Sequence, residues 1–267
     1  MAVTDRFSGG RVRLPESGAR LFGIALGLAA WYGLASVFPN QLMPYPLETL
    51  QLTWELIVSG VVVPHLAATL WRTLWGFVGA AIIGSVLGVL MGSNDYGRRF
   101  VLPYVVAGIS VPAIAWAAIS TLVFGFSQMT PIMATVAVTF PFIAINVWKG
   151  VENIDADLVA MSSSFGVSNR RLLWRVVVPN ASPQLFSGAR FGLAISWKIV
   201  TIAEIFASSS GIGYKLIQAY SRYQFEKAWA WAVVFMLVIL LIEYGVFRPL
   251  ERKVYEYRPD ADFDVIV

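Results

Sequence analysis

An uncharged stretch of 49 residues, from Phe100 to Trp148, limits what this chain can fold into more than any other feature. About 20 apolar residues are enough for one helix to cross the hydrocarbon core of a bilayer. The stretch is too long for a single crossing, and the run Gly125-Phe126-Ser127-Gln128, followed by Pro131, favours a turn near its middle. The stretch therefore predicts two membrane spans joined by a short loop.

The composition agrees with this prediction, because 57% of the 267 residues are hydrophobic and only 13% are charged. A soluble domain has about a quarter of its residues charged. Six spans are predicted, at 21–38, 73–93, two within 100–148, 184–206 and 228–247. The expected fold class is an all-α integral membrane protein. Its first span is expected to be a retained signal anchor and not a cleaved signal peptide.

Basic residues mark the cytoplasmic side of such a protein. Four lie in the tail 1–20, two at 98–99, five between Lys149 and Arg190 and four from Arg248 onward, whereas the loops 39–64 and 125–131 have none. Both termini and the segment 157–183 are therefore predicted to be cytoplasmic. These positions explain the net charge of +4 without a nucleic-acid partner. Three bases on the opposite side, Lys215, Arg222 and Lys227, favour a folded or re-entrant segment there.

The domain organisation follows from the same pattern. We expect a cytoplasmic tail 1–20, one transmembrane domain 21–250 that includes a hairpin at 156–179, and a cytoplasmic tail 251–267. The sequence has no cysteine and one histidine, His65, which excludes a thiolate or His-cluster metal site. No nucleophile or paired-carboxylate pattern supports a membrane enzyme.

Small residues recur every four positions in the second span, at Gly76, Ala80, Gly84, Gly88 and Gly92. This spacing places them along one helix face, where another helix can approach closely. The pattern predicts tight helix packing. Two alternatives stay open: packing within the chain, and a moving or dimer interface.

Several polar residues lie within or beside the predicted spans. A charged side chain at the bilayer centre costs about 2.5–3.5 kcal/mol on insertion scales, so Glu204 is expected either at a transport pathway or in a structural ion pair. Lys198 is a second pathway candidate. Asn146 is expected to line a cavity or to bond a neighbouring backbone group. Glu243 is expected near the membrane interface, neutralised by Arg248, and His65 is interpreted as an interfacial anchor.

The segment 157–183 is a polar, basic island between apolar spans, and it predicts two short helices. Asp157 can cap the first helix, and Gly166 suits the left-handed position that ends it. Ser168 can cap the second helix, and Pro179 is expected to stop it. The basic residues of this second helix are Arg170, Arg171 and Arg175. An amphipathic hairpin lying on anionic lipid is the alternative.

This hairpin resembles the EAA loop of permease subunits of bacterial and archaeal ABC importers. The matching residues are Phe165-Gly166, Leu172-Leu173-Trp174-Arg175-Val176-Val177-Val178-Pro179 and Pro183. Elsewhere the matching residues are His65, Thr69-Leu70, Arg72, Gly76-Phe77, Ala203-Glu204 and Gly211-Ile212-Gly213-Tyr214. The likeness covers about residues 21–258 and is greatest to the branch that serves nitrate, sulfonate and taurine. Where the family has Glu-Ala-Ala, this chain has Ala160-Met161-Ser162, so the glutamate is missing.

The resemblance implies a type I importer-like permease with the coupling hairpin between its fourth and fifth spans. The residues that it implies for coupling are Ala160, Ser164, Phe165, Gly166, Arg170, Arg171 and Pro179. It also implies a multi-pass protein of the cell membrane, a second permease copy, two cytoplasmic ATPases that carry ATP and Mg, and an extracytoplasmic binding protein. This chain would bind no cofactor itself, since its sequence contains no G-x-x-x-x-G-K-[ST] loop.

The expected solute is small and anionic, such as nitrate, a sulfonate or taurine, with neutral pyrimidines as the alternative. A second function stays open, namely a secondary transporter driven by an ion gradient. In that case Glu204 and Glu243 would be proton or sodium sites.

Overall fold

The computed structural model describes residues 16–40, 42–154, 157, 161–162 and 164–249, and every regular element among them is helical. The helices are α1 (Glu16–Val37), α2 (Pro46–Val58), α3 (Val62–Ser93), α4 (Asp95–Ser110), α5 (Ala113–Phe124), α6 (Met129–Glu152), α8 (Asn169–Leu172), α9 (Val178–Ala207), α10 (Ile212–Ser221) and α11 (Phe225–Ile242). Two π-helical segments, η1 (Leu173–Val177) and η2 (Glu243–Phe247), lie before α9 and after α11. Ala160 and the tail 251–267 fall outside the described residues.

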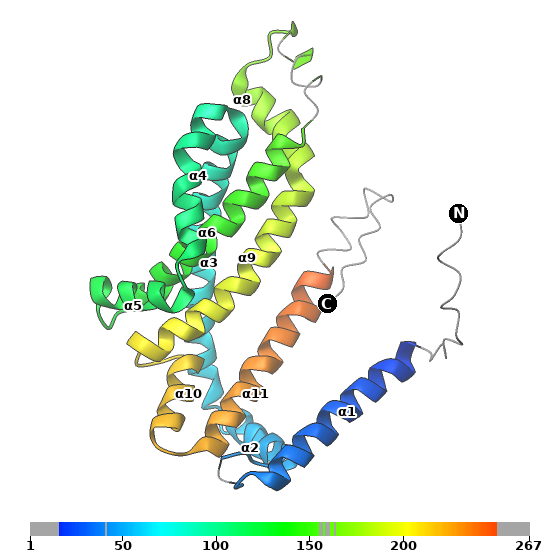
Figure 1. The fold of residues 1–267 in the computed structure, drawn as a ribbon, viewed down its shortest axis with the longest axis vertical. Helices are drawn as coiled ribbons and strands as arrows, with labels where there is room; N and C mark the ends of the chain where they lie inside the picture. The colour runs from blue at the N-terminus through cyan, green and yellow to red at the C-terminus, as the bar shows by residue number, and fades with distance from the viewer. Residues whose placement is uncertain (1–15, 41, 155–156, 158–160, 163, 250–267) are drawn as a thin grey trace, which may run out of the picture.

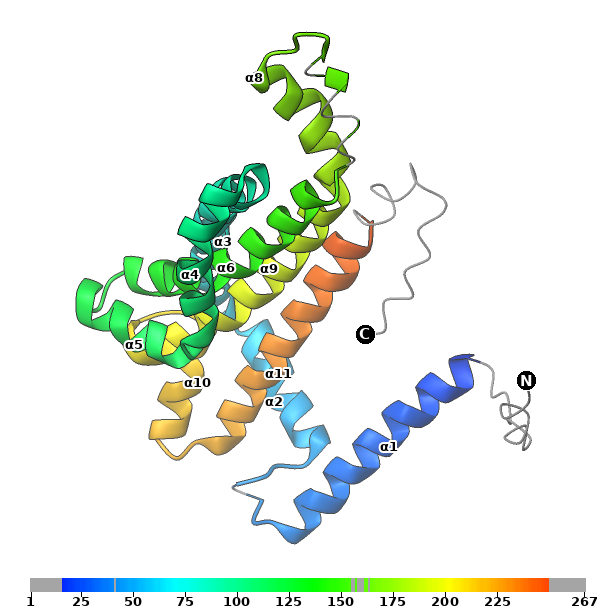
Figure 2. The same ribbon diagram turned by 45° about the horizontal axis from the view of Figure 1, so that its top comes forward.

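Helices α3, α6 and α9 run side by side through the middle of the molecule (Figures 1 and 2). Figure 1 shows α8 at one end of this bundle and α2 and α10 at the other. Helix α1 stands apart from the bundle and touches it near its own C-terminal end, where the rings of Trp31 and Trp229 lie 5.8 Å apart. The molecule is therefore elongated, with its polar hairpin and its α10 region at opposite ends.

Among the residues that the structure describes, three helices are long and apolar enough to cross a membrane: α3, α6 and the segment Phe225–Gly245. Two bent pairs, α4 with α5 and Gln184–Ala207 with α10, raise this number to five if each pair is one span. The apolar part of α1, Leu21–Val37, is shorter. Each of the six predicted spans thus corresponds to a helix or a bent pair, and the count of six crossings stays a prediction.

The third predicted span is not one straight helix, because α4 and α5 meet at an angle of 99°. Proline 112 begins the turn into α5, and the residue before a proline is disfavoured in the helical region. Val111 accordingly has extended backbone angles, φ −77° and ψ 125°. The predicted turn at 125–128 is confirmed: Gly125, with φ 62°, ends α5, and α6 begins at Met129.

Helix α3 begins at Val62, well before the predicted start at Thr73, and α2 occupies much of the segment expected to be a loop. Proline 46 in the first turn and Glu48 near the N-terminus both favour a helix start there. The early start of α3 brings His65 and Arg72 into the helix. The prediction of an uncharged span therefore left out Arg72, a charged residue whose exposed fraction is only 2%.

The small-residue ridge of α3 lies against α6 within the same chain. A Cβ atom added to Gly84 would lie 2.7 Å from the carbonyl oxygen of Phe140, and one added to Gly88 would lie 2.6 Å from that of Ala144. Gly76 and Gly92 meet side chains of α6 at 2.7 Å and 2.6 Å in the same way. Backbone atoms cannot turn aside, so these glycines set the distance between the two helices.

Helix α9 packs on the opposite part of α6 through its own small residues. Gly188 lies over Asn146, Gly192 lies over Ile143, and the Ser196 hydroxyl is 3.4 Å from that of Thr139. One position later, the ring of Trp197 stacks on Phe235 of α11 at 5.4 Å. Helix α9 is thereby held between α6 and α11, and it connects the hairpin at one end of the molecule to α10 at the other.

Candidate functional site

The hairpin turn has the geometry that its sequence predicts. Gly166 has φ 65°, in the left-handed region, and the N–H of Val167 donates to the carbonyl of Ser162 at 3.1 Å. This bond spans the turn as in a Schellman helix end. The N–H of Leu172 donates to the carbonyl of Ser168, which places Ser168 at the start of α8. Asp157 is helical, but the residues beside it lie outside the described part, so its capping role stays a prediction.

The prediction that Pro179 stops the second helix is wrong. Helices α8 and α9 are continuous through the π-helical segment η1, and Pro179 lies in the first turn of α9. In a regular helix the proline ring would clash with the carbonyl four residues earlier, and the wider π turn avoids this conflict. The hydroxyl of Ser182 donates to the carbonyl of Pro179 at 2.8 Å. This bond satisfies a carbonyl to which Pro183, which has no backbone N–H, cannot donate. The second arm of the hairpin, α8, and α9 therefore form one continuous helix.

The hairpin presents large apolar side chains that the described residues of this chain leave exposed. Phe165 is 80% exposed, and Met161 and Trp174 are more than half exposed. Ser164 and Arg171 are exposed beside them, while the side chain of Arg170 lies outside the described part. Exposed aromatic and arginine side chains on a projecting element are typical of a protein interface. The hairpin thus has the features of a docking element.

At the other end of the bundle, a buried polar network surrounds Arg72 of α3. Its guanidinium donates from Nη1 to Glu204 Oε1 at 2.7 Å and to the carbonyl of Ser210 at 2.7 Å. It also donates from Nη2 to the Ser210 hydroxyl at 2.8 Å and from Nε to Gln128 Oε1 at 2.6 Å. Arg72 is 2% exposed and Glu204 is fully buried. One side chain thereby connects α3, the start of α6, α9 and the turn before α10.

Two further residues of α3 extend the network to the turn 208–213. The Thr69 hydroxyl lies 3.0 Å from both carboxylate oxygens of Glu204 and accepts the N–H of Ile212 at 2.9 Å. His65 Nδ1 accepts the N–H of Gly211 at 3.2 Å, and Glu204 Oε2 accepts the N–H of Gly213 at 3.0 Å. Three successive backbone N–H groups are thus satisfied by α3 and α9, which fixes the start of α10.

Glycine 211 is required by this arrangement. Its φ is 111°, where side chains are strained, and an added Cβ would overlap the carboxylate of Glu204. The geometry excludes a larger residue at the point where α10 turns away from α9. The turn is therefore built around the ion pair.

The structure decides several sequence expectations. Glu204 makes a structural ion pair, and its partner Arg72 was not predicted. The His65 ring accepts a hydrogen bond from the turn before α10, and its role as an interfacial anchor stays a prediction. Glu243 pairs with Arg190 and not with Arg248, whose guanidinium lies 4.3 Å from the centre of the Tyr244 ring.

The two other pathway candidates lie apart from this network. Asn146 donates to the carbonyl of Phe142 at 2.8 Å, which is the backbone-bonding alternative. Lys198 is exposed on α9 and is considered below. In the part of the chain that the structure describes, no group of His, Asp and Glu side chains is arranged to hold a metal ion.

A sequence signal for the network existed. His65, Thr69 and Arg72 recur four and three residues apart, which places them on one helix face. A polar stripe within an apolar helix indicates a buried partner. The spacing could have predicted the stripe, but not that the partner would come from a residue 132 positions away.

Comparison with known proteins shows which family the chain resembles. The model of the family described as "Binding-protein-dependent transport system inner membrane component" matches residues 80–254. The putative aliphatic sulfonates transport permease protein SsuC of Bacillus subtilis is 30% identical over 236 residues, covering 88% of this chain and 85% of the relative. The taurine transport system permease protein TauC of Escherichia coli is 24% identical, covering 86% of each chain.

Among solved structures, the inward-facing MetNI methionine ABC transporter contains a chain with a similar fold. The TM-score is 0.58 at 21% identity, covering 70% of this chain and 91% of that chain. At this identity the match shows the fold alone. It agrees with the all-helical architecture expected from the resemblance to importer permeases.

Proposed function

Because the chain belongs to the family of binding-protein-dependent transport system inner membrane components, we propose that it is the membrane-spanning subunit of an ATP-driven importer. The observation that carries this proposal is the hairpin, whose exposed Phe165 lies in the turn just before α8, while α8 is continuous with α9 through η1. A cytoplasmic ATPase receives this surface. The chain itself has no phosphate-binding loop, so ATP and Mg are bound by that partner.

The mechanism that we propose is alternating access. ATP binding draws the two ATPases together, and each moves the hairpin seated in it. A rigid rod transmits displacement along its axis, and α8, η1 and α9 form such a rod from the hairpin to the Arg72–Glu204 network. Movement at the cytoplasmic end thereby displaces the turn before α10, and the pathway opens to the outside.

The coupling residues are Ser164, Phe165, Gly166, Arg170, Arg171 and Pro179. Phe165 supplies the apolar contact, and Gly166 allows the tight turn that presents it. Arg171 offers charge to the partner. Pro179 acts through η1, which connects the hairpin to α9. The lack of the family's glutamate at Ala160 leaves the docking to these residues.

The assembly is proposed to contain two copies of this chain, two ATPases and an extracytoplasmic binding protein. Both termini and the hairpin lie on the cytoplasmic side of the cell membrane, as the basic residues indicate. The α2 and α10 end then meets the binding protein. A small anionic solute is supported by the names of the relatives, which refer to aliphatic sulfonates and taurine.

The test is solute uptake by vesicles that contain this chain, its ATPase and its binding protein. Uptake should require ATP hydrolysis. Neither a proton gradient nor a sodium gradient should drive uptake in its place. The coupling proposal adds that Phe165→Ala separates hydrolysis from uptake. Uptake that is unchanged in this variant would contradict the hairpin's role.

A further inference from the structure

One face of α9 is exposed although it lies within a candidate span. Phe191, Ala194 and Lys198 share this face, since they are three or four residues apart. The opposite face packs on α6 through Gly192 and Ser196. Of these three exposed side chains, only Lys198 is charged.

Lys198 lies in the interior of its candidate span and not near either end. In the segment Gln184–Ala207 it lies roughly 21 Å from the first residue and roughly 13 Å from the last, at about 1.5 Å per residue. A lysine side chain can extend toward the interface only near a helix end. Lipid is therefore an unfavourable environment for this face.

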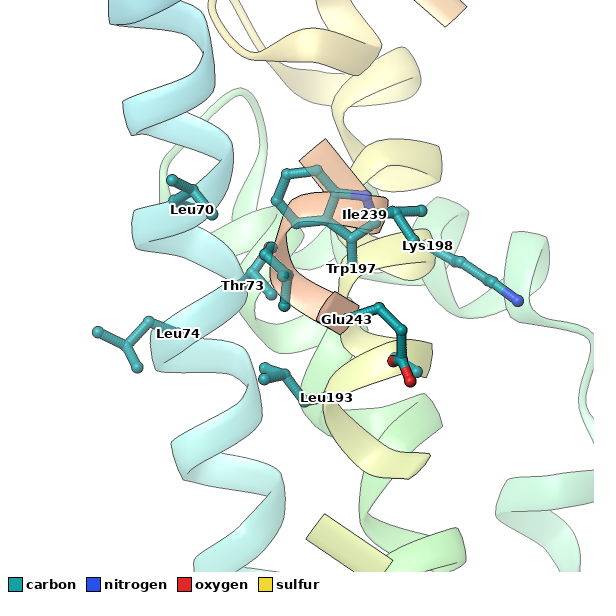
Figure 3. Close-up of a pocket in the computed structure, with 10 residues that line it drawn as sticks. Leu70, Thr73, Leu74, Leu193, Trp197, Lys198, Ile239 and Glu243 are labelled. Carbon is teal, nitrogen blue, oxygen red and sulfur yellow. The ribbon is translucent and has the colours of Figure 1, made fainter. Parts of the chain in front are cut away.

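No carboxylate pairs with Lys198 within the described ranges. The acidic residue that lines the same crevice, Glu243, is paired with Arg190. The crevice between α3, α9 and α11 has a volume of about 430 Å³ and is lined mainly by apolar side chains, Leu70, Leu74 and Leu193 among them. Figure 3 shows Lys198 at its edge, with the ammonium group directed away from Leu70 and Leu74.

We propose that Lys198 faces the aqueous transport pathway and is the residue that favours anions there. This inference rests on the proposed importer function. An ammonium group in a confined aqueous path attracts anions and repels cations, because low-dielectric walls strengthen its field. With two copies of the chain, two such lysines contribute to one pathway. The aliphatic part of the solute can contact the neighbouring apolar residues of α9.

The chain offers a clean experiment, because it contains no cysteine of its own. Ala194 is one helical turn from Lys198 and is exposed on the same face. We would introduce Ala194→Cys and measure its reaction with an anionic and a cationic methanethiosulfonate reagent of similar size. The measurement uses the complete complex with its ATPase in lipid vesicles. The rate ratio, which is the reaction rate of the anionic reagent divided by that of the cationic reagent, should be about tenfold higher with Lys198 present than after Lys198→Ala.

Two variants serve as controls. Lys198→Arg keeps the charge and should keep the rate ratio. Ser221→Cys, exposed at the end of α10 and distant from Lys198 in the sequence, should show a ratio that Lys198→Ala leaves unchanged. Failure of both reagents to modify Ala194→Cys would overturn the proposal, since the face would then be in lipid or packed. A ratio that is insensitive to Lys198→Ala would overturn it as well.

The same vesicles separate this inference from the importer proposal. The amount of solute taken up per ATP hydrolysed, compared with and without Phe165→Ala, tests the coupling hairpin and does not involve the reagent ratio. An insensitive ratio with intact coupling overturns the role of Lys198 alone. If Phe165→Ala leaves uptake per ATP unchanged while Lys198→Ala lowers the rate ratio, the coupling proposal is overturned and the position of Lys198 in the pathway is supported.

Discussion

The guanidinium of Arg72 on α3 and the carboxylate of Glu204 on α9 lie 2.7 Å apart, and both are almost completely excluded from solvent. Each charge is costly to bury alone, and together they bond the turn that starts α10. The pair therefore decides how the end of α9 is held against α3.

Removing one member of this pair should destabilise the protein strongly. We expect Arg72→Leu to cost about 3–5 kcal/mol of unfolding free energy, because Glu204 would remain buried without its partner. The double variant Arg72→Leu/Glu204→Leu should lose less. Thermal unfolding in detergent measures both. Arg98→Ala, which breaks exposed pairs with Asp95 and Glu152, is the control and should cost at most about 1 kcal/mol. A double variant less stable than the single one would refute the explanation.

The glycine ridge of α3 should not tolerate an added methyl group. Gly88→Ala places a Cβ 2.6 Å from the carbonyl oxygen of Ala144, so α3 and α6 must separate. We expect a loss of about 1–3 kcal/mol, as is usual for overpacking. Gly27→Ala on α1 meets nothing within 4 Å and should cost nothing measurable. Equal unfolding temperatures for the two variants would contradict the packing argument.

The left-handed turn at Gly166 should be necessary for coupling. Gly166→Val is strained at φ 65° by about 1–2 kcal/mol and should displace Phe165. We expect ATP hydrolysis to continue while uptake falls. Gly60 also has a positive φ, 75°, but lies between α2 and α3 at the other end of the molecule. Gly60→Val introduces similar strain there, and uptake per ATP should not change. If both variants uncouple equally, the hairpin has no special role.

The exposed ring of Phe165 should be what holds the ATPase. Phe165→Ala should reduce co-purification of the ATPase with this chain while leaving the unfolding temperature unchanged. Phe126 is exposed to nearly the same extent, 84%, in the loop between α5 and α6. Phe126→Ala is therefore the matched control, and the ATPase should remain bound. An ATPase retained equally by both variants would argue against hairpin docking.

Much of the fold is predictable because the signals are local. The length of the uncharged stretch 100–148 requires two spans, and the turn near Gly125 is at the predicted place. Gly166 ends its helix as expected because left-handed backbone angles select glycine at that position. These features depend on a few neighbouring residues and therefore appear in the sequence.

The missed features depend on residues distant in the chain or on competing local effects. Proline alone suggests a helix end, so a helix end is expected at Pro179. The π-helical segment η1 accommodates this proline, and the helix continues into α9. Arg72 lies just before the uncharged run 73–93, and the sequence does not show that its charge is neutralised within the helix by Glu204, which comes from another helix. The angle between α4 and α5 is similarly set by packing, although Pro112 marks where the bend occurs.

Uptake of an aliphatic sulfonate or of taurine into vesicles containing the complete complex tests the central claim most directly. The account predicts that uptake requires ATP, continues when proton and sodium gradients are collapsed, and is lost in Phe165→Ala but kept in Phe126→Ala. Uptake that proceeds without ATP and stops when the ion gradient is removed would contradict it.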